Sequence, residues 1–305
     1  MEKFLHYAFE KFLSPAVKEK SERLILSIAI LSYLVHLAMI GMVNLQWVDL
    51  DAKFLRNPIA AIYTPFSFIL IYEVYLLIFF LPQSSSVYIG KQYEIITLII
   101  IRRIFKDIAG IELTTDWFQV RGDLQFTFDV LTSLVLFLLI YFFYRLVRKK
   151  ASVGEGIPAD KGRNVRTFIR LKQALAVALV PVLLGLALYT LVEWVVESVS
   201  HYQEGILGIG NLNNIFFDEF FTILIIVDVL LLLASFYYSD RFHTIIRNSG
   251  FVISTILIKI SFSVDGVLNN ILIVGAVLFG LLMLMVHNLY EGSHRETGVP
   301  RAADG

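Results

Sequence analysis

Apolar residues along this chain gather in eight long runs that are separated by short polar segments. A helix that crosses a bilayer needs about 20 mostly apolar residues. The runs lie at about 24–44, 60–82, 90–108, 126–147, 172–197, 215–238, 248–264 and 268–289. The third and seventh are short and interrupted by cations, so we expect neighbouring helices to shelter them from lipid. The pattern predicts an all-α polytopic membrane protein with about eight transmembrane helices.

Composition agrees with this class. Hydrophobic residues make up 57% of the chain, charged residues 17%, and the mean hydropathy is +0.72, whereas charged residues are about a quarter of an ordinary soluble domain. The formal net charge of +0 gives no sign of a nucleic acid partner. The absence of cysteine excludes disulfides, thiolate metal sites and a cysteine nucleophile.

The second half of the chain repeats the pattern of the first. Glu73 lies within the apolar run FSFILIYEVYLLIFFLP, and Asp228 within FFTILIIVDVLLLLASF. When these carboxylates are superposed, with a one-residue gap in the following loop, Arg103 falls on Lys259. Four spans per copy is an even number, so both copies enter the membrane in the same direction. The chain is therefore predicted to hold two tandem four-helix repeats in parallel orientation.

The same pattern divides the chain into four regions. Residues 1–150 hold an N-terminal amphipathic segment and the first four-helix repeat. Residues 151–163 are a cytoplasmic linker, because ASVGEGIPADKG is rich in Gly, Pro and Ser. Residues 164–291 form the second repeat, and 292–305 lack apolar periodicity and are expected to be disordered.

Loop cations predict the orientation of the spans. Cytoplasmic loops of membrane proteins carry an excess of Lys and Arg. The cations that flank the first, fourth and fifth spans are Lys3, Lys11, Lys18, Lys20, Arg23, Arg145, Arg148, Lys149, Lys150, Arg163, Arg166, Arg170 and Lys172. Both termini are therefore expected in the cytoplasm.

Charged residues inside the apolar runs are the candidate functional residues. Each costs about 2.5 to 3.5 kcal/mol on insertion scales, so a charge kept in hydrocarbon needs a partner or a role. Glu73 is expected near mid-bilayer, with Arg102 and Arg103 about one turn outward, within reach of an arginine side chain. Asp228 and Lys259 are expected to repeat this pair in the second copy.

Asp129 adds a second acceptor at the outer start of the fourth span. It corresponds roughly to Asn270 in the second copy. The first copy is therefore the more highly charged of the two.

Each copy has the same order of elements: an acid within an apolar helix, a basic stretch (KQYEIITLIIIRRIFKDI and FHTIIRNSGFVISTILIKIS) and a last helix led by Asp or Asn (DVLTSLVLFLLIYFF and NILIVGAVLFGLL). This order resembles the phosphate-starvation-inducible PsiE family of small four-helix membrane proteins. The resemblance covers about 62–146 and again 217–287. It implies a cell inner (plasma) membrane location and carries no established activity, and the chain departs from it by being duplicated.

The buried charges favour a protein that senses or passes protons or small ions, with Glu73, Arg102, Arg103, Asp129, Asp228 and Lys259 as a relay. The alternative is a non-catalytic structural or regulatory membrane subunit in which the same pairs only lock helix packing. A voltage sensor would carry cations at every third position over several turns, and that ladder is absent. Besides the lipid bilayer, the expected partners are a second copy of the chain or another membrane protein.

Enzyme chemistry is not indicated. The chain has no H-E-x-x-H, G-x-x-x-x-G-K-[ST] or G-x-S-x-G motif. No two of its six histidines share a span at i, i+4, so no metal site or bis-histidine haem is expected. We therefore predict no catalytic residue, no cofactor and no metal ion.

Overall fold

The computed structural model describes residues 2–46, 61–108, 121–151, 162–200, 209–238 and 242–296. These ranges form α-helices and contain no strand, which confirms the all-α prediction. The helices are α1 (Glu2–Leu13), α2 (Pro15–Asn44), α3 (Tyr63–Phe80), α4 (Ser85–Ile108), α5 (Arg121–Ala151), α6 (Gly162–Ser200), α7 (Ile209–Tyr238), α8 (Phe242–Ser261) and α9 (Val267–Glu296).

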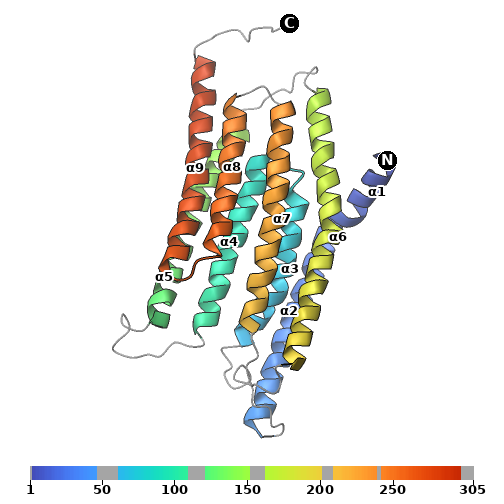
Figure 1. Ribbon diagram of the computed structural model, residues 1–305, viewed down its shortest axis with the longest axis vertical. Coiled ribbons are helices and arrows are strands. Elements are labelled where there is room, and N and C mark those ends of the chain that lie inside the picture. The colour runs from blue at the N-terminus through green and yellow to red at the C-terminus, as the bar shows by residue number, and fades with distance from the viewer. Residues whose placement is uncertain are drawn as a thin grey trace.

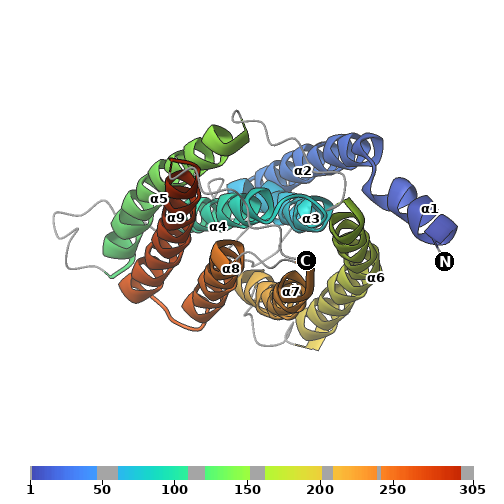
Figure 2. The same ribbon diagram turned by 90° about the horizontal axis from the view of Figure 1, so that it is seen from above.

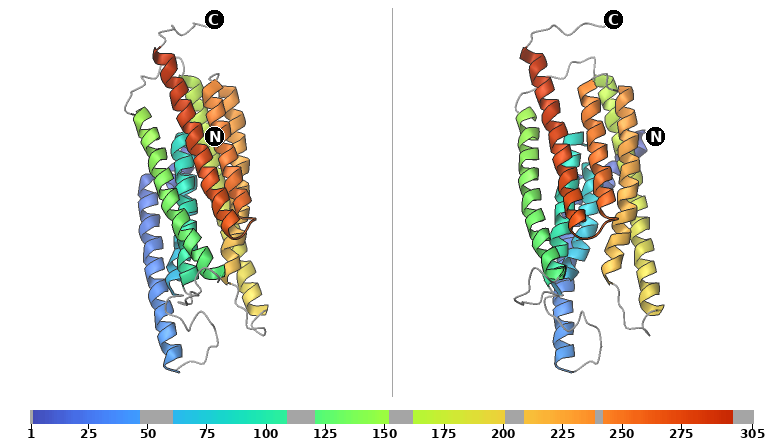
Figure 3. Two further views of the ribbon diagram at one scale, coloured as in Figure 1. Left: turned by 90° about the vertical axis from the view of Figure 1, so that its left-hand side faces the viewer. Right: turned by 60° about the vertical axis from the view of Figure 1, so that its left-hand side comes forward.

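Helices α2 to α9 run alternately up and down along the long axis of one elongated bundle (Figure 1). Helix α4 lies in the middle of the bundle when it is seen from above (Figure 2), in contact with α3, α5 and α8. Helices α5 and α9 lie side by side along one side of the bundle (Figures 2 and 3). Contacts between α4 and α8, and between α5 and α9, join the first half of the chain to the second.

Six helices in the described ranges are long and apolar enough to cross a membrane, rather than the eight that the apolar runs predict. They are Leu5–Asn44, Asp123–Arg148, Arg166–Leu186, Glu219–Tyr237, Phe242–Ser261 and Val267–Gly292. Helix α3 contributes a shorter apolar stretch, Thr64–Phe80. Helix α4 is not among these helices, because its sequence SSVYIGKQYEIITLIIIRRIFKDI carries too many charges.

The central position of α4 explains how it carries these charges. Much of its length is buried, including the large side chains Tyr93, Ile96 and Ile100 and the polar side chains of Gln92 and Arg102. The bundle therefore removes this helix from lipid, as the interrupted third run predicts.

Close packing between the two halves depends on one small residue of α9. A Cβ atom on Gly280 would lie 1.7 Å from the Tyr93 hydroxyl oxygen of α4, far inside any allowed contact. The space that Gly280 leaves is filled by Tyr93, whose hydroxyl is 2.8 Å from the Ser254 hydroxyl of α8. The halves therefore meet through α4, α8 and α9 at this level.

The N-terminal amphipathic segment is a helix of its own. Ser14 caps α2 by accepting a hydrogen bond from the Val17 amide at 3.3 Å, and Pro15 starts the new helix. Leu13 of α1 is buried while Tyr7 and Phe12 are exposed, and α1 contacts α6. Its location at the membrane surface stays a prediction.

Two predicted boundaries fall largely outside the described residues. Most of the linker 151–163 is not described. Helix α9 continues to Glu296, five residues into the segment 292–305 that was expected to be disordered, and the rest of that segment is not described.

Candidate functional site

Helix α4 carries an ion pair toward its second half. The Arg102 guanidinium donates to the Glu73 carboxylate of α3 at 3.0 Å, and both side chains are 4% exposed. This contact confirms the predicted proximity of Glu73 to Arg102, whereas the hydrogen bonds of Arg103 go to other residues.

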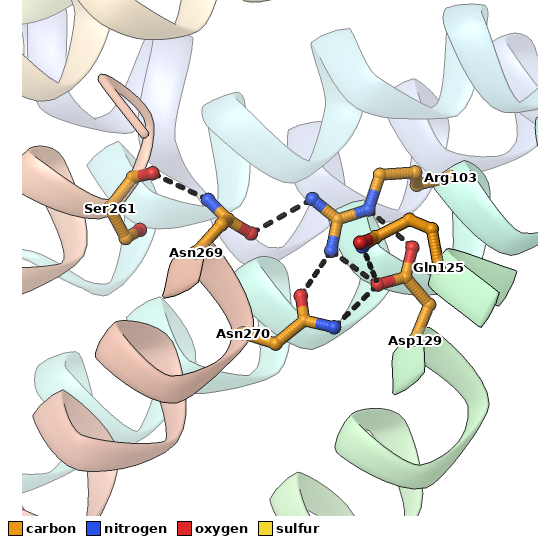
Figure 4. Close-up of polar contacts among 6 residues, drawn as sticks. All are labelled: Arg103, Gln125, Asp129, Ser261, Asn269 and Asn270. Atoms are coloured by element: carbon orange, nitrogen blue, oxygen red, sulfur yellow. Dashed lines mark hydrogen bonds and ion pairs between the residues drawn. The ribbon is translucent and has the colours of Figure 1, made fainter. Parts of the chain in front are cut away.

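The next residue of α4 organises a larger set of polar groups, which we name the Arg103 cluster: Arg103, Gln125, Asp129, Asn269 and Asn270 (Figure 4). Arg103 donates two parallel hydrogen bonds to the Asp129 carboxylate, from Nε at 2.5 Å and from Nη2 at 2.6 Å. Such a fork fixes geometry as well as neutralising charge. Asp129 therefore is the second acceptor that the sequence predicts.

Two neighbouring asparagines of α9 complete the cluster from the other half of the chain. Arg103 donates to Asn269 at 2.8 Å and also to Asn270. The Asn270 amide donates to Asp129 at 2.7 Å, and the Gln125 amide donates to the same oxygen at 2.7 Å. Asn270, predicted to be the counterpart of Asp129, thus touches it directly.

The backbone around α9 explains how these asparagines reach Arg103. The turn between α8 and α9 contains Gly266 at φ +74, a conformation that glycine adopts without strain. The Asn269 side chain donates back to the Ser261 carbonyl at the end of α8 (Figure 4). The cluster therefore ties α4, α5 and the α8–α9 turn together, with its charged groups bonded within the protein.

Asp228 of α7 has different partners from those predicted. Gln92 of α4 donates to its carboxylate at 3.1 Å, and Thr255 of α8 donates to the Gln92 amide oxygen at 2.8 Å. In the described part of the chain, neither a hydrogen bond nor an ion pair joins Asp228 to Lys259, which corrects the expected pairing. Asp228 is connected to α8 through Gln92 and Thr255. Lys259 lies one helical turn beyond Thr255 on α8.

A small cavity lies against Asp228, and we name it the Asp228 cavity. Its volume is about 30 Å³, and space for one water needs about 10 to 15 Å³ on this measure. Residues of four helices surround it: Ser85, Tyr88, Ile89, Phe168, Lys172, Asp228, Leu231, Leu232, Asn248, Phe251 and Val252. It has room for about two waters or one small ion.

Lys172 of α6 is the cation of this cavity. Its ammonium donates to the Gln83 carbonyl at 2.8 Å and lies 5.1 Å from the centre of the Phe168 ring. Lys172 and Asp228 are both buried and close enough to attract each other electrostatically. The sequence predicts Lys172 to be one of the loop cations, yet its side chain is buried within the bundle.

The hydroxyl of Tyr88 also belongs to this cavity. Tyr88 is 3% exposed, and its hydroxyl makes no hydrogen bond with good geometry although it lies beside Asp228. A buried polar atom without a partner is uncommon and needs an explanation, such as a water or an ion. This hydroxyl could not be identified from the sequence, because an interfacial tyrosine at a span end is ordinary.

A chain of polar contacts continues from the cavity toward the end of α9. Arg247 donates to the Asn248 side-chain oxygen from Nε at 3.3 Å and from Nη2 at 3.1 Å. Its Nη1 is 3.1 Å from His287 Nε2, which lies 3.6 Å from the Glu291 carboxylate. Half-buried charged groups therefore continue from the Asn248 side of the Asp228 cavity.

Metal binding finds no support in the described part of the chain, where no group of three or more His, Asp or Glu side chains could hold an ion. No family model, no curated protein and no solved structure matches the chain. The PsiE resemblance therefore stays a prediction.

Proposed function

We propose that this chain is a non-catalytic integral membrane protein that senses or passes protons or small ions, and that Asp228 is the group that takes up and releases the proton. The observation that carries the proposal is a buried carboxylate beside a cavity that has room for water. A proton can reach a carboxylate only where water or another titratable group approaches it, and the Asp228 cavity supplies that approach.

The position of Asp228 supports exchange with one side of the membrane. The carboxylate lies ten residues before the end of α7, about 15 Å along the helix. Ser85, the first residue of α4, lines the same cavity. Asp228 is thus nearer to the end of α7 that the positive-inside rule assigns to the cytoplasm than to its other end.

The proposal includes eight spans in two parallel repeats, in the cell inner membrane with both termini cytoplasmic. Helices α3 and α4 complete the count when α4 is taken as a sheltered span. The contacts of α4 with α8 and of α5 with α9 support the repeat, because each joins two helices that hold equivalent places in the two copies, as helices beside a twofold axis do.

The Arg103 cluster supports a second candidate function, a structural or regulatory membrane subunit. Its charged and amide groups bond to one another, and no observation there calls for a moving ion. If Asp228 behaved in the same way, the whole chain would be a scaffold for a second copy or for another membrane protein.

The test is infrared difference spectroscopy of the purified protein in liposomes during a pH titration. A protonated carboxyl group has a C=O stretching band that its ionised form lacks. We expect one such band to appear reversibly on acidification and to be missing in Asp228→Asn. Proton flux into the same liposomes, followed with an enclosed pH-sensitive dye, then separates passing from sensing.

Glu219→Gln is the matched control, because Glu219 lies on the same helix but is exposed. It should keep both the band and any flux. A wild-type protein with no titrating band assignable to Asp228 and no flux, at unchanged melting temperature, would reject the proposal in favour of the structural subunit.

A further inference from the structure

Apart from the Asp228 carboxylate, the polar groups that line the Asp228 cavity can all donate hydrogen bonds. Lys172 contributes an ammonium group, Ser85 a hydroxyl, and Tyr88 a buried hydroxyl that lies beside Asp228 without a hydrogen bond of good geometry. Asn248 contributes an amide whose oxygen is already occupied by Arg247, which leaves its N–H groups. A metal cation would need oxygen acceptors in place of these groups.

Charge around the cavity favours an anion once Asp228 is neutral. Asp228 is the single acidic residue among those that line the cavity, and Lys172 is the single cation. From α8, the Arg247 guanidinium reaches the cavity wall through Asn248 and lies 5.9 Å from the centre of the Phe251 ring. From α9, His287 faces Arg247 and lies 3.6 Å from the Glu291 carboxylate, so Glu291 offsets the Arg247 charge and Lys172 is the cation that remains at the cavity. From α4, the facing titratable group is Tyr88. Protonation of Asp228 therefore leaves a buried site with net positive charge and unused donors.

We propose that the Asp228 cavity binds a halide ion, with chloride as the common example, when Asp228 is protonated. This inference rests on the proposed function, because it needs Asp228 to take up a proton. One proton enters with one anion, so the pair adds no net charge to the buried site. The volume of about 30 Å³ has room for a monatomic ion.

Thermodynamic linkage gives the inference a direct measurement. If protonation of Asp228 raises the affinity for chloride, then chloride must raise the proton affinity of Asp228 by the same factor. Couplings between sites are commonly about 5-fold to 150-fold. We expect an increase of about tenfold in proton affinity between gluconate and chloride at equal ionic strength.

The experiment is the infrared pH titration of Asp228 in liposomes, in potassium gluconate and in potassium chloride. Tyr88→Phe removes one buried hydroxyl and little volume. It should keep the titration in gluconate and lose most of the chloride effect. Tyr141→Phe, at an exposed tyrosine of α5, is the matched control and should behave as wild type.

The outcomes separate the two proposals. A titrating Asp228 with the same midpoint in both salts overturns the anion site, because the cavity then holds water only, and leaves the proposed function standing. A chloride effect of equal size in Tyr88→Phe also overturns it, because the anion then binds elsewhere. Absence of any Asp228 titration overturns both proposals.

Discussion

The Arg103 cluster and the Asp228 cavity both join the two halves of the chain through α4, yet they satisfy buried charge in different ways. Arg103 meets Asp129 in a two-pronged contact, and Asn269 and Asn270 bond to the remaining groups. Asp228 has one hydrogen bond from Gln92, a cation on a different helix and an open space beside it. In the Arg103 cluster the charged and amide groups are already bonded to one another, so the cluster gives no sign of a ligand site.

This difference assigns separate roles to residues that look alike in the sequence. A buried pair that loses one member leaves an uncompensated charge, which is strongly destabilising. A carboxylate beside a cavity can instead be neutralised by a proton with little rearrangement. We therefore expect large stability changes and no change in proton binding at the Arg103 cluster, and the reverse at Asp228.

The largest effect is expected for Arg103→Leu. It strands the buried Asp129 carboxylate and removes hydrogen bonds from both asparagines, so the free energy of unfolding should fall by about 3 to 5 kcal/mol. Unfolding in mixed detergent micelles measures the change. Arg145→Gln, at an exposed arginine of α5, is the control. A loss below about 1 kcal/mol, as for a surface pair, would remove the distinction between the two regions.

The Glu73–Arg102 pair should show strong coupling in a double-mutant cycle. Glu73→Leu or Arg102→Met alone leaves one buried charge and should lower stability by about 3 to 5 kcal/mol. The double variant removes both charges and should be more stable than either single variant. Additive losses in the same unfolding assay would mean that the two charges do not compensate each other.

Gly280→Ala tests the packing between the regions. The new methyl group would collide with the buried Tyr93, and overpacking of this kind costs about 1 to 3 kcal/mol. Gly275→Ala, on the same helix with nothing within 4 Å of its Cβ position, is the matched control. Equal melting temperatures for the two variants would contradict the close approach of α4 and α9.

The smallest stability change is expected for Asp228→Asn. The amide oxygen can still accept the bond from Gln92, and one such hydrogen bond contributes only about 0.5 to 1.5 kcal/mol. We expect a change within about 1 kcal/mol, together with complete loss of the titrating carboxyl band. A loss as large as that of Arg103→Leu would make Asp228 another locked charge.

Depth along the helices made part of the site predictable. Rise per residue placed Glu73 near the two arginines, and Asp129 was expected to add a second acceptor. In the structure Arg102 pairs with Glu73, and Arg103 pairs with Asp129. The sequence also indicated that the charged third run needs shelter. Depth does not say which face of a helix meets which neighbour, so the pairing of Asp228 with Lys259 was wrong.

The cavity could not be predicted for the same reason. Gln92 and Tyr88 are ordinary residues of a span end, and their role depends on the packing of α4 against α7 and α8. Lys172 carried a usable signal, since it stands at the start of an apolar run with Phe168 one turn before it. Lys172 was instead taken as one of the loop cations that predict membrane orientation, because cations at cytoplasmic span ends are common.

The bonds from α4 to α9 also constrain how the protein is made. Arg103 finds its asparagine partners 166 and 167 residues later in the chain. A ribosome adds about 5 to 20 residues each second, so many seconds pass between the synthesis of Arg103 and the synthesis of Asn269 and Asn270. A chain that stops after α5 would lack Asn269 and Asn270, two of the hydrogen-bond acceptors of Arg103. The two halves are therefore partners in biogenesis, and the first half should be cleared rapidly when it is synthesised alone.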